Sequence, residues 1–87
     1  MKYKVGDQVI DIAYPESSGQ IIECFNNWKD LCNKNTFVTA GDPDLWLSIQ
    51  EILFTPEQLE ENWYTIHCFA GGAIWTCESR LGIYNMN

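Results

Sequence analysis

Positive charge is scarce in this sequence. Only five of the 87 residues are lysine or arginine, against twelve aspartates and glutamates, which gives a formal net charge of −7. Proteins that hold nucleic acids non-specifically contact the phosphates with lysine and arginine, so direct nucleic-acid binding is not expected. A partner protein with a basic surface fits this charge better, because opposite charges accelerate encounter.

The sequence also lacks an apolar run of membrane-spanning length, and its first residues, MKYKVGDQVI, lack the apolar centre of a signal peptide. We therefore expect a cytoplasmic protein that makes no membrane contact. The four cysteines are expected to be reduced core residues, because no secretory signal supports disulfides. No C-x-x-C pair is present, so the sequence predicts neither a metal site nor a cofactor.

The clearest pattern that is present is a β-hairpin over residues 63–81, WYTIHCFAGGAIWTCESRL. Gly71 and Gly72 separate two apolar runs, and a tight two-residue turn needs positive φ at both central positions. With these glycines as the whole loop, His67 lies opposite Thr76. Because side chains alternate along a strand, one face is apolar and points to the core. The other face is mixed and carries Trp63, Thr65, His67, Phe69, Ile74, Thr76, Glu78 and Arg80. A slip of one residue in the turn would exchange the faces.

Shorter strands are expected on both sides of this hairpin. Alternating apolar residues predict a first strand over residues 3–12, interrupted by a turn or bulge at Gly6-Asp7. A second strand is expected over residues 20–25, and a last short strand over residues 82–84. The chain therefore reads as mainly β.

The middle of the chain predicts helices. Asn27 can cap a short helix that places Trp28, Leu31 and Cys32 on one face. Thr55-Pro56-Glu57-Gln58 is a capping box with proline at the first helical position, and it opens a helix to about residue 62. Residues 45–54, LWLSIQEILF, fit either a helix or a strand, and both alternatives stay open.

The motifs VGDQVIDI, SGQIIE and the hairpin together resemble the small SH3-like barrels of the KOW and Tudor kind. The matching positions are Val5, Gly6, Asp7, Val9, Gly19, Ile21, Ile22, Tyr64, Ile66, Cys68, Gly71, Gly72, Trp75, Glu78, Ser79 and Leu81. The resemblance implies an α+β, mainly β fold: one SH3-like domain over residues 1–87, with a partly helical insertion between its second and third strands at about residues 26–62. It implies no particular function, because such barrels host many unrelated activities.

For function, we expect a non-enzymatic binding protein. Its size and charge are similar to those of bacteriophage accessory proteins that inhibit a host nuclease or defence complex. The contacts are expected to come from acidic and aromatic side chains: Trp63, His67, Phe69, Ile74, Glu78, Arg80, Glu57, Glu60, Glu61, Asp42 and Asp44. Trp63 and Arg80 are expected to form a cation–π pair across the hairpin. The mixed face is either exposed, where it can also support a homodimer, or covered by the insertion.

Two other functions stay open. In the first, the protein sequesters a small nucleotide-type signal: Trp28, Trp46, Trp63 or Trp75 stacks on the base, and Arg80, Lys29 or Lys34 meets the phosphate. In the second, the protein is a small hydrolase in which Glu78 assists His67 as a general base. No recognisable motif places a nucleophile beside His67, so no catalytic residue is predicted.

Overall fold

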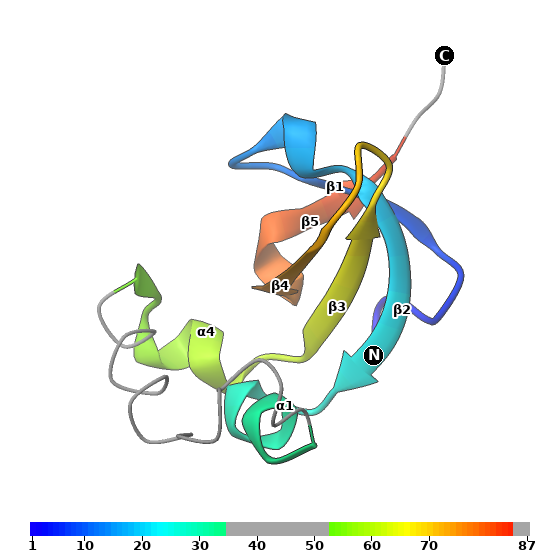
Figure 1. Ribbon diagram of the computed structural model, residues 1–87. Coiled ribbons are helices and arrows are strands. Elements are labelled where there is room, and N and C mark those ends of the chain that lie inside the picture. The colour runs from blue at the N-terminus through cyan, green and yellow to red at the C-terminus, as the bar shows by residue number, and fades with distance from the viewer. Residues whose placement is uncertain (35–52, 85–87) are drawn as a thin grey trace.

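The computed structural model describes residues 1–34 and 53–84 (Figure 1). It shows an α+β protein that consists mainly of five antiparallel strands in one sheet, in the order β4-β3-β2-β1-β5. The strands are β1 (Gln8–Asp11), β2 (Gly19–Phe25), β3 (Trp63–Cys68), β4 (Ala73–Cys77) and β5 (Leu81–Ile83). Among the described residues, two helices, α1 (Trp28–Lys34) and α4 (Pro56–Glu60), lie between β2 and β3, and two 3₁₀ turns, η1 (Pro15–Ser17) and η2 (Glu78–Arg80), precede β2 and β5.

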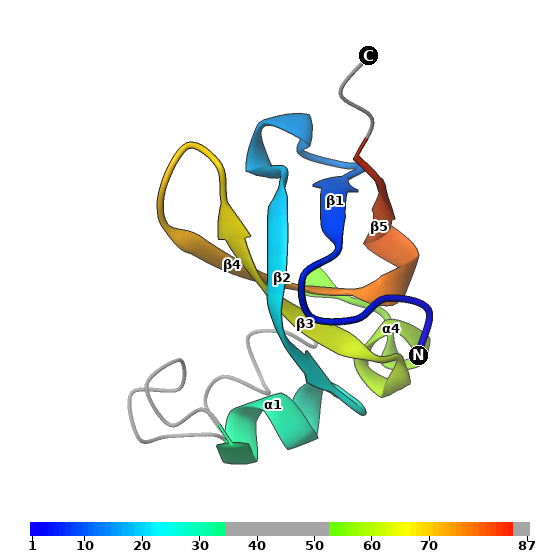
Figure 2. The same cartoon turned by 90° about the vertical axis from the view of Figure 1, so that its right-hand side faces the viewer.

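The sheet curls but stays open. Figure 2 shows β1 and β2 side by side, with β5 beyond β1 and with β3 and β4 crossing behind. β4 and β5 are the two edges, and within the described residues no strand pairing joins them. The predicted SH3-like barrel is therefore not confirmed, whereas the mainly β class is.

Two clusters of buried side chains flank the sheet, one on each face. The cluster inside the curl consists of Tyr3, Val9, Ile21, Tyr64, Ile66 and Leu81. The cluster on the other face consists of Phe25, Trp28, Leu31, Cys32, Trp63 and Cys77, and it includes residues of α1. β3 supplies residues to both clusters, and its first four residues are all buried. At Trp63, the structure therefore shows the alternative in which the insertion covers the mixed face.

The hairpin between β3 and β4 has a longer loop than the sequence suggests. Gly71 and Gly72 do adopt positive φ, at 103° and 78°. However, the Gly71 N–H donates to the Cys68 oxygen at 3.0 Å, and the Cys68 N–H donates to the Gly72 oxygen at 3.0 Å. A tight turn followed by glycine is the usual three-residue hairpin loop. The two-residue loop predicted from the sequence is therefore wrong, although the hairpin itself is confirmed.

The loop length changes the faces of β4. His67 lies opposite Ala73 rather than Thr76, which is a shift of three residues. Because the shift is an odd number, every β4 side chain changes face. Ile74 then lies opposite Ile66 and packs against the inner cluster, and Trp75 packs against the cluster that contains α1. Packing of the half-buried Ile74 against the buried Ile66 inside the curl favours this register over the predicted one.

The helix caps agree with the sequence. The Asp30 N–H donates to Asn27 Oδ1 at 2.7 Å, and the predicted helical face of α1 is buried. At α4, the Gln58 N–H donates to the Thr55 hydroxyl at 3.2 Å, and the Thr55 N–H donates to Gln58 Oε1 at 2.9 Å. Both predicted helix starts are therefore confirmed, although α4 ends at Glu60, two residues earlier than expected.

The first strand is shorter than expected. Residues 4–7 form the turn predicted at Gly6-Asp7, in which the Asp7 N–H donates to the Lys4 oxygen at 3.1 Å and Gly6 has a φ of 98°. The residues before this turn belong to no strand. The second and last strands match their predictions within a residue. The helix-or-strand alternative for residues 45–54 falls almost wholly outside the described residues.

Candidate binding groove at the open edge of the sheet

A groove of about 250 Å³ borders the edge strand β4. Three parts of the chain that are distant in sequence form its walls: β4 with the adjoining η2, the end of β1 with η1, and the residues before α4. The lining residues are Asp11, Tyr14, Ser17, Leu53, Phe54, Ile74, Trp75, Thr76 and Arg80. The groove exists because the sheet is open, since η2 and β5 do not pair with β4.

Two polar side chains in the groove wall have unused hydrogen-bonding capacity. Thr76 is 3% exposed, and its hydroxyl has no hydrogen-bond partner within the described residues. The same holds for the indole N–H of its neighbour Trp75. A buried polar group without a partner costs about 1–3 kcal/mol. A ligand that offers a hydrogen bond here would recover part of that cost.

Arg80 forms one wall of the groove through its contact with Phe54. Its guanidinium lies 4.1 Å from the Phe54 ring centroid, and it donates to the Leu53 oxygen at 3.3 Å. The predicted pairing of Arg80 with Trp63 is wrong, because Trp63 lies opposite Cys77 and is fully buried. The Phe54 ring contacts both Arg80 and Trp63: it meets Trp63 edge-on, with ring centroids 4.8 Å apart.

The opposite wall is held by Asp11. This carboxylate is 5% exposed, and its Oδ1 accepts the N–H groups of Ala13 at 2.9 Å and Tyr14 at 3.2 Å. The turn that follows β1 is fixed in this way. As a result, Tyr14 lines the groove while its side chain remains exposed.

Some backbone groups of β4 beside the groove have no hydrogen-bond partner among the described residues. In an antiparallel pair, alternate residues direct their N–H and C=O groups towards the neighbouring strand, and the residues between direct them away. The bond from the Cys68 N–H to the Gly72 oxygen sets this alternation. With the observed register, Ile74 and Thr76 bond to β3, and Ala73 and Trp75 present their backbone groups to the open edge.

Acidic side chains stand on the elements that flank the groove. Glu16 of η1, and Glu57 and Glu60 of α4, are exposed. η1 and α4 lie on the side of β4 that faces away from β3 (Figure 1). Among the described residues, the one ion pair joins Lys34 to Asp30 at 3.2 Å, so these three glutamates have no counter-charge there. The surroundings of the groove are therefore negative.

The other predicted contact residues are scattered. His67 is exposed and opposite Ala73, whereas Glu78 accepts hydrogen bonds from the Tyr64 hydroxyl at 2.6 Å and the Lys2 N–H at 2.8 Å. The structure does not bring His67 and Glu78 together, so the geometry predicted for a hydrolase is wrong. Phe69 is exposed and packs on Tyr84, and Glu61 accepts the Ser79 N–H. Trp28 is buried and Lys29 is exposed. Three further predicted residues lie outside the described residues: Asp42, Asp44 and Trp46.

Of the predicted contact residues, Ile74 and Arg80 line the groove, as does Trp75 from the nucleotide alternative. Asp11, Tyr14 and Phe54 were not predicted. Asp11, with Tyr14 three residues later, does indicate a fixed turn, because aspartate side chains often accept backbone hydrogen bonds in turns. No sequence pattern indicated that this turn lies beside β4, because the two segments are about sixty residues apart.

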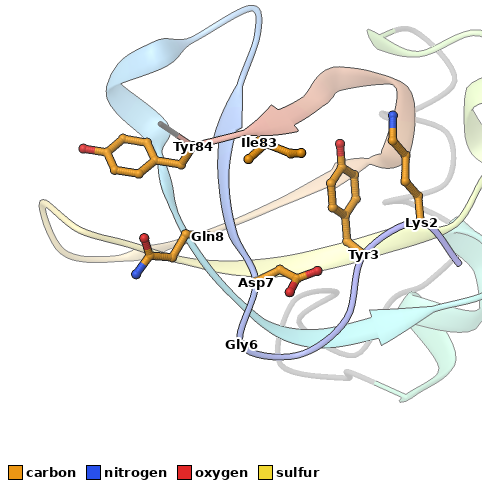
Figure 3. Close-up of a pocket in the computed structure, with 7 residues that line it drawn as sticks. All are labelled: Lys2, Tyr3, Gly6, Asp7, Gln8, Ile83 and Tyr84. Atoms are coloured by element: carbon orange, nitrogen blue, oxygen red, sulfur yellow. The ribbon is translucent and has the colours of Figure 1, made fainter. Parts of the chain in front are cut away.

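A larger cavity, of about 490 Å³, lies between the N-terminal segment and the end of β5 (Figure 3). Lys2 and Tyr3 line one side in that view, and Tyr84 and Gln8 line the other. Its buried hydroxyl is already satisfied, since the Tyr3 side chain donates to the Leu81 oxygen at 3.0 Å. Asp7 Oδ2 likewise accepts the Lys4 N–H at 3.0 Å. Because its buried hydroxyl and its carboxylate are already paired, this cavity is a weaker candidate than the groove.

The cysteines are all free thiols, and three of them are buried. Burial raises the pKa of the Cys32 thiol to about 11, and it also raises the pKa of Cys24, Cys68 and Cys77. A protonated thiol is a poor nucleophile and a poor metal ligand. In the parts of the chain described, no three His, Cys, Asp or Glu side chains are grouped to hold a metal ion, and no helix is long and apolar enough to cross a membrane.

Comparisons with known proteins add no relative to this description. No protein-family model, curated protein or solved structure matches the chain.

Proposed function

We propose that the protein is a non-enzymatic binding protein that docks on a basic surface of a partner protein. The observation that carries this proposal is the arrangement of exposed Glu16, Glu57 and Glu60 on the two elements beside the groove. The net charge of −7 attracts a basic partner over a distance, and the groove and strand edge supply short-range contacts. This size and charge suggest an inhibitor of the phage type, directed at a host nuclease or defence complex.

The SH3-like relationship remains part of the proposal. The resemblance rests on an opening strand, a second strand, a hairpin and an exit strand. β1, β2, the β3–β4 hairpin and β5 follow in that order, with β5 beside β1. This succession supports an SH3-like origin in which the seam between β4 and β5 has stayed open.

The proposal is tested by capture of partners from a host lysate at low and high salt. The variant Glu57→Gln/Glu60→Gln removes two charges from α4, and Glu23→Lys changes the net charge by the same amount on β2, where Glu23 is also exposed. The α4 variant should lose the captured partner, and Glu23→Lys should retain it. Capture that is insensitive to salt, or equal in the two variants, would contradict an electrostatic contact through α4.

One observation favours a second function, sequestration of a nucleotide-type ligand. Trp75, Tyr14 and Arg80, an indole, a phenol and a guanidinium, line the same groove. Aromatic rings stack on bases, and arginine pairs with phosphate. A ligand that binds only the native state raises the melting temperature. A nucleotide that raises the melting temperature of the protein but not of Arg80→Gln would support this function, and no rise across a broad nucleotide panel would remove it.

A further inference from the structure

We propose that β4 binds an extended, basic and apolar peptide segment of the partner as an added antiparallel strand. This inference rests on the proposed function and names the part of the partner that the groove receives. Ala73 and Trp75 supply the backbone hydrogen bonds, and the groove receives the side chains on one face of the peptide.

The backbone of β4 fits this occupant. Ala73 and Trp75 direct their N–H and C=O groups to the open edge, which is enough for two pairs of strand-to-strand hydrogen bonds. A peptide of about four to five residues in extended conformation would span that length, and edge strands bind peptides in this way in several protein classes.

The groove fits alternate side chains of such a peptide. Side chains of an extended strand alternate between faces, so every second residue of the peptide faces the groove. Leu53, Tyr14 and Ile74 give that side an apolar lining, and Thr76 adds a buried hydroxyl without a partner in the described residues. The peptide is therefore expected to alternate apolar residues with residues that face solvent.

The flanking charges select basic peptides. Glu16 lies at one side of the groove, and Glu57 and Glu60 lie on the helix that follows its Leu53–Phe54 wall. Arg80 lines the groove and keeps its positive charge while it contacts Phe54 and the Leu53 oxygen. The three exposed glutamates outnumber this one cation, so the net charge around the groove is negative. The opposite edge, at β5, borders a cavity lined by one cation and one carboxylate, Lys2 and Asp7. A basic peptide is therefore expected to prefer β4, which the three exposed glutamates flank.

The inference is tested with a displayed library of random nonapeptides selected on the full-length protein. The selected sequences should alternate apolar residues and carry lysine or arginine. A synthetic consensus peptide should slow hydrogen exchange at the Ala73 and Trp75 amides, and should leave the Ile83 amide at the other edge unchanged. Peptides that bind without protecting the two β4 amides would overturn the inference.

Matched substitutions at the two edges sharpen the test. Ala73→Pro removes an outward N–H at β4. Ile83→Pro does so at β5, because Ile83 lies between the pairs that bond β5 to β1. Loss of one strand hydrogen bond, together with the clash of the proline ring, should weaken peptide binding roughly tenfold in Ala73→Pro, while Ile83→Pro keeps its affinity. Equal affinities in the two variants would overturn the inference.

Modified peptides give the same information without altering the protein. N-methylation of the residues whose N–H groups bond to β4 should abolish binding, and N-methylation of the residues between them should not. Equal effects would argue against strand addition. Protection of the Ala73 amide in the free monomer would show that the chain fills its own edge. A dimer that Ala73→Pro converts to monomer would assign the edge to a second copy. Either result would overturn the inference.

The failure of this inference can be told apart from the failure of the proposed function. If Glu57→Gln/Glu60→Gln weakens partner capture but Ala73→Pro does not, docking through α4 stands and the added strand does not. If neither variant changes capture, both fall.

Discussion

The Tyr64 hydroxyl donates to Glu78 Oε1 at 2.6 Å, and the same oxygen accepts the Lys2 N–H at 2.8 Å. This contact joins the inner cluster to η2 and to the N-terminal segment. Burial acts to raise the pKa of Glu78, but the hydrogen bonds from Tyr64, Lys2 and Asn62 outweigh it and lower that pKa. Burial and the same carboxylate raise the pKa of Tyr64, so the phenol stays a donor at all ordinary pH values.

Tyr64→Phe should destabilise the fold. The substitution keeps the ring in the inner cluster but removes a hydrogen bond to a charged acceptor, which costs about 1.5–3 kcal/mol. The free energy of unfolding, measured by denaturant titration, reports the loss. Tyr14→Phe is the matched control, because Tyr14 is exposed and no hydrogen bond of its hydroxyl is observed in the described residues. A loss as large in the control would show that the Glu78 contact contributes little.

The Tyr64–Glu78 hydrogen bond also predicts how the free energy of unfolding depends on pH. Because the pKa of Glu78 is lower in the folded protein than its usual value of 4.5, the folded state favours the carboxylate. Its stabilisation is therefore complete above pH 4.5 and is lost as the pH falls through the folded pKa. Glu78→Gln should be less stable at pH 7, and its difference from the natural protein should shrink towards pH 3. A constant difference across this range would contradict the assignment.

Gly19 should not tolerate a side chain. A Cβ at this position would lie 2.2 Å from the His67 oxygen and 2.8 Å from the Cys68 Cα, both backbone atoms of the paired strand. Gly19→Ala is therefore expected to lose about 3 kcal/mol or more, or to separate β2 from β3. Gly82→Ala is the control, because its Cβ would meet only Ile10 and Ile12 side chains, at 3.5 Å or more. Equal melting temperatures for the two variants would contradict the close approach.

The capping box at Thr55 should be worth about 1 kcal/mol. Thr55→Ala removes the acceptor of the Gln58 N–H, and Thr55→Ser retains it. The effect is expected in the first turn of α4, where amide exchange should become faster in the alanine variant only. Serine and alanine variants that exchange alike would show that Pro56 and packing hold the helix start without the cap.

The thiols should differ in their reactivity. Cys24 is half-buried, whereas Cys32 is fully buried with a pKa of about 11, so its thiolate is rare near neutral pH. In the native protein, a disulfide reagent at pH 8 should modify Cys24 first and Cys32 only when the protein unfolds. Mass spectrometry of the modified peptides identifies the order. Modification of Cys32 as fast as that of Cys24 would contradict the packing of α1.

Local signals in the sequence predicted local structure well. The caps at Asn27 and Thr55 depend on side chains within three residues of each helix start, so the pattern alone contains the necessary information. The hairpin was found for the same reason. Its register was not, because a glycine pair suits both a two-residue and a three-residue loop. The pairing of Ile66 with Ile74 inside the curl decides between them, and that is a property of the whole sheet.

The groove could not be predicted, for a related reason. Asp11 and Arg80 belong to elements that each look ordinary in the sequence, and the groove that both of them line depends on β4 and β5 not pairing. Whether a curled sheet closes depends on how its edges meet in space. The glutamates Glu57 and Glu60 of α4, in contrast, were predicted as contact residues, and both are exposed.

The position of β3 between two layers limits how this chain can be redesigned. Many domains tolerate replacement of a long insertion between two strands by a short linker. Here the insertion carries α1 and α4, and its removal would expose Trp63 and its neighbours to water. A minimal scaffold made by trimming residues 26–62 would therefore aggregate unless that face of β3 were rewritten with polar residues.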